Sequence, residues 1–228
     1  MSPARQLPLP LPHEPSFARE DFLVGPSNAA ALALIEAWPE WPAPLMLLVG
    51  PPGAGKSHLA AIFAARAGAR RLRGLDLGAI DPEAEAHGAA LALDDADAVG
   101  PAEATLFHLL NFARARGVCV LMTARRPPDL WGLATPDLLS RLRLAPVVEI
   151  APPEEELVAA VLTKLFSDRQ LGVEPALVAY LARRLDRSLE AARALVEKLD
   201  VEALSQAKKV TRAMAAPFLA SFLASDED

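Results

Sequence analysis

The spacing of hydrophobic residues divides the chain into two regions. Up to about residue 152, short continuous apolar runs alternate with longer, alanine-rich helical patterns. A run of this kind is typical of a strand that a parallel sheet buries on both faces. The runs predict strands at residues 45–50, 70–77, 89–97, 118–124 and 146–153, and the patterns between them predict helices at 27–38, 56–68 and 102–117.

Beyond that region the strand pattern stops and only helical patterns remain. They predict four helices, at residues 153–170, 174–185, 188–206 and 209–223. Strands that alternate with helices, followed by helices alone, indicate an α/β domain joined to a small all-α domain. We place the boundaries at residues 1–20 for an extended, proline-rich tail, 21–151 for the α/β domain and 152–228 for the helical domain.

Composition and charge narrow the class of protein. Hydrophobic residues make up 52% of the 228 positions and aromatic residues only 5%, which favours tight helix packing over a β-sandwich. The single cysteine, Cys119, excludes an internal disulfide and is typical of the reducing cytoplasm. No apolar run approaches the roughly 20 residues of a membrane-spanning helix. The net charge of −6 predicts little or no direct DNA binding, and the arginines at 70–73 and 183–184 are interpreted as solvated charges.

A phosphate-binding pattern follows the first predicted strand. "GPPGAGKS", from Gly50 to Ser57, matches G-x-x-x-x-G-K-[ST]. Glycines let backbone N–H groups turn toward phosphate oxygens, and the next helix directs its positive end at the same place. A glycine-rich turn with an incidental lysine is the alternative, but the flanking strand and helix favour the phosphate site. The candidate nucleotide-binding residues of this segment are Pro52, Gly53, Ala54, Gly55, Lys56, Ser57 and His58, with packing as the alternative role of His58.

Two acids end the third predicted strand, "LALDD". Asp94 is the candidate that holds Mg²⁺ together with the hydroxyl of Ser57, because hard cations prefer oxygen ligands. Asp95 lies beside it, where an acid can orient a water molecule for ATP hydrolysis. The alternative is a strand end with two solvated carboxylates. The phosphate loop earlier in the chain favours the metal site over this alternative.

These motifs together resemble those of a known family. "GPPGAGKSHL", "ALDDADAV" followed by "LFHLLN", "LMTARRPP" and "LLSRLR" resemble the AAA+ ATPases of the DnaA group, over most of residues 17–223. The resemblance implies a P-loop domain with a parallel sheet, followed by a small helical lid. "FLVGPSN" is similar to the segment that this family places against adenine, which adds Val24 to the candidate nucleotide contacts. The stretch from Gly68 to Gly88 is short for the family, so we expect a strand or helix to be trimmed there or missing.

The resemblance also implies roles for three further residues. Thr123 matches sensor 1, which touches the γ-phosphate region. Arg141 matches the arginine finger, which acts on a nucleotide held by a neighbouring subunit. Arg187 matches the sensor 2 arginine of the lid. From the residues alone, Arg141 reads as an ordinary surface charge and Arg187 as the start of a helix. The chain departs from the family at Arg125 and Arg126, where related proteins often carry an acid.

The tail contains the peptide "QLPLPL", from Gln6 to Leu11. Its prolines predict a polyproline-like strand whose ordering entropy is partly paid in advance. Leu7, Leu9 and Leu11 are then able to fill apolar pockets of a partner, and Gln6 is able to form hydrogen bonds with a polar rim around them. A disordered leader, or a strap on its own domain, is the alternative. Within the DnaA-like family, the peptide resembles that by which the short Hda homologues bind the DNA polymerase sliding clamp (β subunit).

Three hypotheses for the function follow. The resemblance implies a regulator that binds ADP or ATP with Mg²⁺, attaches to the clamp, and stimulates hydrolysis of DnaA-bound ATP through Arg141. Its own ATPase activity is then weak at most, and its location is the cytoplasm, at the replisome or nucleoid. The alternatives are an autonomous AAA+ ATPase, such as a helicase loader acting on single-stranded DNA, and a clamp-dependent adaptor with a structural nucleotide. The sequence leaves open whether ADP or ATP is the working ligand and whether the protein forms a homo-oligomer.

Overall fold

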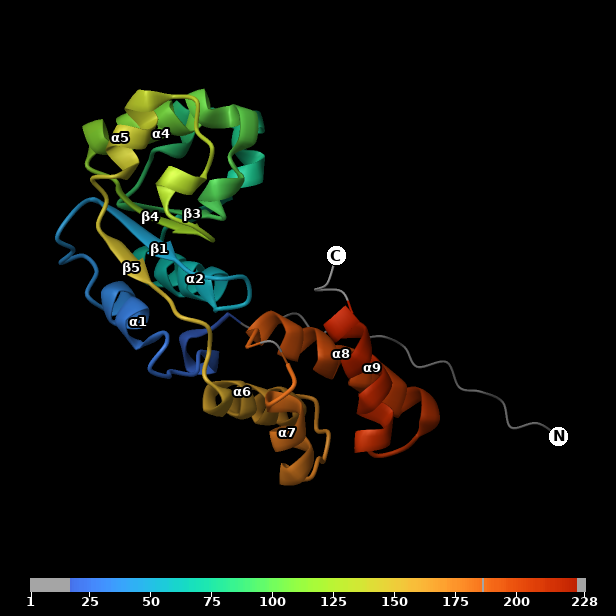
Figure 1. Cartoon of the computed structure of the whole chain (residues 1–228). Coiled ribbons are helices and arrows are strands. Elements are labelled where there is room, and N and C mark those ends of the chain that lie inside the picture. The colour runs from blue at the N-terminus through green and yellow to red at the C-terminus, as the bar shows by residue number, and fades with distance from the viewer. Residues whose placement is uncertain (1–16, 186, 225–228) are drawn as a thin grey trace. The chain divides into compact units, whose positions relative to one another are not determined.

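The computed structural model describes residues 17–185 and 187–224, with side chains as far as residue 221 (Figure 1). The predicted clamp-binding peptide at residues 6–11 lies outside the described residues. The described chain forms two compact units, one from Phe17 to Pro152 and one from Pro153 onward. Phe17 to Glu20, which the sequence prediction assigns to the tail, belong to the first unit.

The first unit is built on a five-stranded sheet. Its strands are β1 (Leu45–Val49), β2 (Arg70–Arg73), β3 (Ala90–Asp94), β4 (Cys119–Ala124) and β5 (Val147–Glu149). All neighbouring strands pair in parallel, in the order β2-β3-β4-β1-β5. The prediction of a parallel sheet is therefore confirmed.

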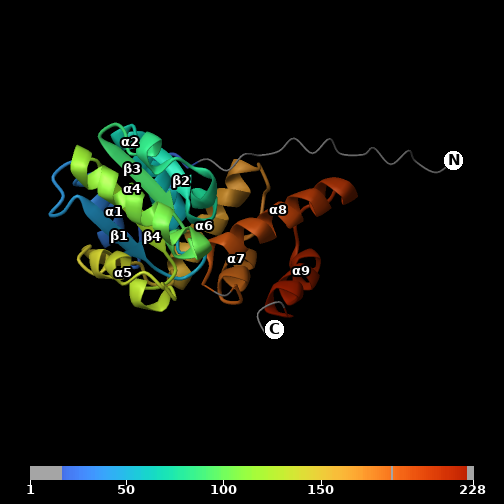
Figure 2. The ribbon, with the colours of Figure 1, turned by 90° about the horizontal axis from the view of Figure 1, so that it is seen from above.

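Helices cover both faces of this sheet (Figure 1). On one face lie α1 (Ala29–Glu36) and α2 (Lys56–Ala67), which pack on Met46 and Leu48. On the other lie α3 (Pro82–Glu85), α4 (Glu103–Arg116) and α5 (Pro136–Leu142). Figure 2 shows α4 lying over the strands. Burial on both faces explains why the central strands read as continuous apolar runs instead of alternating ones.

The short stretch between Gly68 and Gly88 retains its strand but keeps little helix. β2 has four residues at the edge of the sheet, and the helix after it, α3, also has only four. A 3₁₀ segment, Gly74–Ala79, connects the two. The stretch thus holds one short strand and one short helix, and its comparison with the family stays a prediction.

The second unit contains the helices α6 (Glu155–Asp168), α7 (Pro175–Ala182), α8 (Leu189–Gln206) and α9 (Arg212–Ala224). They share one apolar core, in which Phe166, Leu181 and Leu195 are almost completely buried. Ser188 begins α8 as its N-cap, since its hydroxyl accepts a hydrogen bond from the amide of Ala191. The predicted all-α region is confirmed. Within the described residues, no helix has both the length and the apolar character that a membrane span requires.

Candidate functional site

The phosphate loop connects β1 to α2 and depends on its glycines. Gly53 and Gly55 have φ angles of 70° and 93°, which side chains with a Cβ rarely adopt. Gly50 leaves β1 so close to β5 that a Cβ there would lie 2.6 Å from the carbonyl oxygen of Ile150. The loop leads directly into the N-terminal end of α2, where unpaired amides and the helix dipole favour an anion.

Lys56 is a buried cation at this helix start. Its side chain donates hydrogen bonds of 2.8 Å to the carbonyl oxygens of both Gly50 and Pro51, and the residue is only 6% exposed. Burial lowers the pKa of Lys56, an effect that the nearby carboxylates of Asp95 and Asp97 partly oppose. The lysine is therefore held against the loop, where the sequence predicts a phosphate.

The ends of β3 and β4 bring three predicted site residues together. The two strands are neighbours, so their carboxyl ends meet at one edge of the sheet. The buried hydroxyl of Thr123 donates to Asp94 Oδ1 at 2.5 Å and accepts from the backbone N–H of Asp95 at 2.9 Å. Asp95 has a left-handed backbone, with a φ of 49°. Thr123 thus holds the carboxylate of Asp94 and the backbone of Asp95 at once.

Asp94 and Ser57 lie close enough to share one partner. The Nη2 atom of Arg71 is 3.5 Å from Asp94 Oδ2 and 3.5 Å from the carbonyl oxygen of Ser57. Among the described residues, no group of three or more His, Cys, Asp or Glu side chains is placed to hold a metal ion. Oxygens from Ser57 and Asp94, completed by phosphate oxygens and water, match the way in which Mg²⁺ is usually bound. The residues present therefore fit a magnesium nucleotide.

Two residues of this region were not singled out from the sequence. Arg71 was interpreted as a solvated charge, but it forms an ion pair with Asp94. Asp97 accepts a hydrogen bond from the amide of Arg125 through Oδ2, while its buried Oδ1 has no hydrogen-bond partner. The alternation within β2, where only Leu72 is buried, is the signal that places Arg71 on the face opposite Leu72.

His58 and Val24 have different surroundings. The His58 ring meets Phe17 and Phe22 edge-on, at centroid distances of 5.4 and 5.1 Å, and its Nε2 lies 2.9 Å from the carbonyl oxygen of Ala18. These contacts give His58 a packing role. Val24 is 50% exposed and lies in a turn that the Asn28 side chain closes. Asn28 accepts a hydrogen bond from the amide of Gly25 and donates one to the carbonyl oxygen of Leu23. An exposed valine on a fixed turn suits the predicted contact with adenine.

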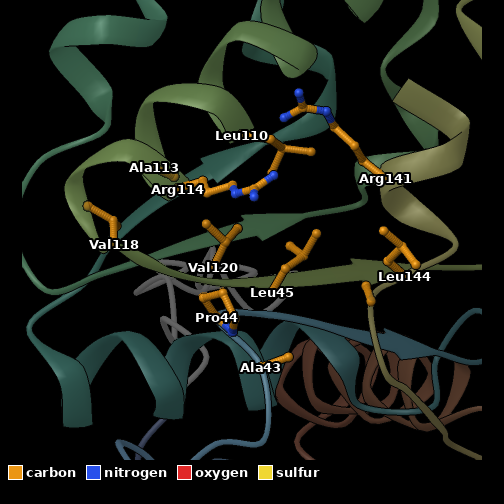
Figure 3. A pocket seen from close by; sticks show the side chains of 11 residues that line it. Ala43, Pro44, Leu45, Leu110, Ala113, Arg114, Val118, Val120, Arg141 and Leu144 are labelled. Atoms are coloured by element: carbon orange, nitrogen blue, oxygen red, sulfur yellow. The ribbon is translucent and has the colours of Figure 1, made fainter. Parts of the chain in front are cut away.

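Arg141 lies at the opposite edge of the sheet from its own phosphate loop. It lines an apolar pocket with Leu45 and Val120, which belong to the amino-terminal ends of β1 and β4 (Figure 3). Its guanidinium lies over the Phe107 ring, 4.7 Å from the centroid, and donates a hydrogen bond to Asn111 Oδ1. The five residues of β1 separate the two edges by about 13 Å of strand. This position is unsuited to a contact with a ligand at the chain's own phosphate loop.

Arg187 belongs to the helical unit. It is exposed, has a φ of 32°, and immediately precedes the Ser188 cap of α8. Its contact with the nucleotide stays a prediction.

Comparisons with known proteins bear on the fold of the chain. No protein-family model matches the chain. A segment of 83 residues, 36% of this chain, is 29% identical to the chromosomal replication initiator protein DnaA of Cutibacterium acnes. The match spans only 17% of the length of that curated relative.

Solved structures match far more of the chain. Domain III of the Thermotoga maritima replication initiation protein DnaA has a TM-score of 0.78 and 20% identity, over 91% of this chain and 97% of that one. AMPPCP-bound DnaA from Aquifex aeolicus has a TM-score of 0.67 and 19% identity, over 80% of this chain and 64% of that one. A single-residue variant of Thermotoga maritima RuvB has a TM-score of 0.67 and 17% identity, over 89% of this chain and 70% of that one. The chain therefore has the AAA+ fold of DnaA domain III.

Proposed function

We propose that this protein is a nucleotide-dependent AAA+ regulator of replication initiation that attaches to the DNA polymerase sliding clamp and stimulates hydrolysis of DnaA-bound ATP. The observation that carries the proposal is that the two ends of the parallel strands carry different groups, where 'edge' means the side of the sheet formed by the carboxyl ends or by the amino ends of the strands. The phosphate loop, Asp94, Asp95 and Thr123 gather at one edge, and Arg141 lies at the other. A module of this kind holds a nucleotide at one edge and presents a cation to a neighbour's nucleotide at the other.

The nucleotide site fits ADP or ATP with Mg²⁺. Lys56 replaces its two carbonyl partners with phosphate oxygens, and the amides at the start of α2 bind the same phosphates. Ser57 and Asp94 hold the metal, which when bound neutralises phosphate charge. Thr123 keeps Asp94 and Asp95 in position. Similar structures of DnaA are bound to AMPPCP, which supports the assignment of the ligand class.

Intrinsic hydrolysis in such a site is slow. The backbone N–H of Asp95 is tied to Thr123, and an aspartate reaches less far than a glutamate toward a water molecule at the γ-phosphate. A slow site suits a switch better than a motor. Turnover of many ATP molecules per second by the purified protein would contradict this part of the proposal, and stimulation of that turnover by single-stranded DNA would favour the helicase-loader alternative.

Attachment to the clamp is assigned to Gln6, Leu7, Leu9 and Leu11. Burial of one leucine contributes roughly 1.5–3 kcal/mol, so three leucines offset the cost of association well enough for a complex of about micromolar affinity. A ring with several identical pockets raises the effective concentration of a weakly bound tail.

Arg141 acts in trans in this proposal. Its guanidinium, steadied by Phe107 and Asn111, adds positive charge to the transition state of ATP held by DnaA. The experiment that tests the function is hydrolysis of DnaA-bound ATP, with and without this protein and clamp loaded on DNA. Faster hydrolysis only when both are present is the expected result, and an unchanged rate would contradict the proposal.

A further inference from the structure

Arg71 lies beside the two residues that are proposed to hold the metal. β2 pairs with β3 so that Arg71 is opposite Ala92 and Arg73 is opposite Asp94. The guanidinium of Arg71 reaches along the strand to Asp94 Oδ2 and to the carbonyl oxygen of Ser57, each at 3.5 Å. A charged group therefore lies where the phosphate loop and the end of β3 approach each other.

Both carboxylate oxygens of Asp94 already have partners. Thr123 donates to Oδ1, and Arg71 faces Oδ2. The Asp94 side chain is only 10% exposed, so an unpaired charge there would be costly. The Arg71 side chain is 39% exposed, which leaves it room to withdraw toward solvent.

The ring of Phe17 gives Arg71 a third contact. Its centroid lies 5.9 Å from the Cζ atom of Arg71, within range of a cation–π interaction, and the ring is nearly perpendicular to that of His58. Arg71 thus faces a carboxylate, a carbonyl oxygen and an aromatic ring. A solvated surface arginine does not have three such partners.

We propose that Arg71 is a resident counter-ion of Asp94 that competes with Mg²⁺ and so reduces the dependence of nucleotide binding on the metal. The inference rests on the proposed nucleotide site. Without metal, the guanidinium neutralises Asp94 and keeps its negative charge from repelling phosphates. With metal, the same positive charge opposes the approach of Mg²⁺ until Arg71 withdraws. Arg71 is a positioning residue, since it acts through Asp94.

The test is the affinity for ADP in excess EDTA and in excess Mg²⁺, measured by calorimetry on the full chain. The relevant quantity is the ratio of the two dissociation constants, EDTA over Mg²⁺. In Arg71→Gln, ADP binds more weakly in EDTA because Asp94 is left unneutralised, and more tightly in Mg²⁺ because the competing charge is gone. We expect the ratio to rise on the order of tenfold.

Two further variants separate charge from fold. Arg73→Gln removes the same charge from the same strand, and Arg73, although paired with Asp94 in the sheet, makes no ion pair within the described part of the chain, so its ratio should change much less than that of Arg71→Gln. Arg71→Lys restores a positive charge and should return the ratio toward the parent value. A lysine variant that behaves like Arg71→Gln would contradict competition by charge.

The outcomes distinguish this inference from the proposed function. Equal ratios for the parent and Arg71→Gln, with ADP bound by both, would overturn the role of Arg71 and leave the nucleotide site standing. If the parent bound ADP neither in EDTA nor in Mg²⁺, both the role of Arg71 and the proposed nucleotide site would be overturned. Phe17→Ala, which releases the guanidinium without changing any charge, gives a second readout and should raise the ratio by a smaller factor.

Discussion

Lys56 combines burial with the need for charge at a single residue. A lysine that binds phosphate must be protonated, yet burial favours its neutral form and holds the pKa of Lys56 below the ordinary value of 10.5. The two carbonyl hydrogen bonds and the nearby carboxylates keep the ammonium in place despite that cost. The residue is therefore sensitive to alkaline pH.

This sensitivity gives a prediction with a definite sign. Lys56 is charged at pH values below its lowered pKa and loses its proton as the pH rises through that pKa. An exposed lysine would lose its proton only at a higher pH. Bound phosphates restore the charge, so ADP affinity should fall with rising pH and binding should take up protons. Calorimetry between about pH 7 and 10, in buffers of different ionisation enthalpy, measures both effects. A constant affinity without proton uptake across this range would show that Lys56 does not meet the phosphates.

At the scale of the element, Glu103 joins α4 to α5, the helix that carries Arg141. Its carboxylate accepts hydrogen bonds from the amides of Ala134 at 2.9 Å and Thr135 at 2.8 Å, just before α5 begins. The bond from Ala134 is the largest cause of the lowered pKa of Glu103, followed by the side chain of Thr135. One carboxylate therefore fixes the start of the helix.

Glu103→Gln tests this link. A carboxyl whose pKa is lowered by folding stabilises the native state above its unfolded pKa, and that stabilisation is lost as the pH falls through the lowered value. The variant should be modestly less stable than the parent near pH 7, and the difference should shrink as the pH drops below about 4. Urea unfolding at several pH values measures it. Glu83→Gln, which removes a surface ion pair with Arg116, is the control, and a Glu103 difference that grew in acid would contradict the argument.

The sequence predicted elements well where burial dictates composition. β1, β3 and β4 read as apolar runs because both of their faces are covered. β2 has a weaker apolar pattern, because Leu72 is its one buried residue and the strand lies at the side of the sheet. No helix was predicted at α5, because it is short and follows a stretch broken by prolines.

The site was predictable only in part. Its loop has a motif that names Lys56 and Ser57, and the apolar strand before Asp94 identifies that acid. The ion pair between Arg71 and Asp94 depends on the pairing of β2 with β3, which no local pattern contains. The same is true of Glu103, whose partners lie about 30 positions along the chain.

For the whole molecule, the proposed function requires two separable attachments. Replacing Gln6, Leu7, Leu9 and Leu11 with alanine should abolish binding to the clamp, because the apolar anchors are gone, and leave ADP affinity unchanged. A pull-down with immobilised clamp, together with calorimetry, measures both. Arg141→Ala is the matched control and should bind the clamp normally. Retention of clamp binding by the tail variant would show that the peptide is not the anchor.

The proposed function requires above all that Arg141 supply charge to ATP held by another protein. The most direct measurement is single-turnover hydrolysis of labelled ATP bound to DnaA, with DNA-loaded clamp and either the parent or Arg141→Ala. By comparison with other arginine fingers, we predict that the variant loses stimulation on the order of a hundredfold or more while it still binds ADP and the clamp. Equal stimulation of DnaA by Arg141→Ala and by the parent would contradict the proposed role of Arg141.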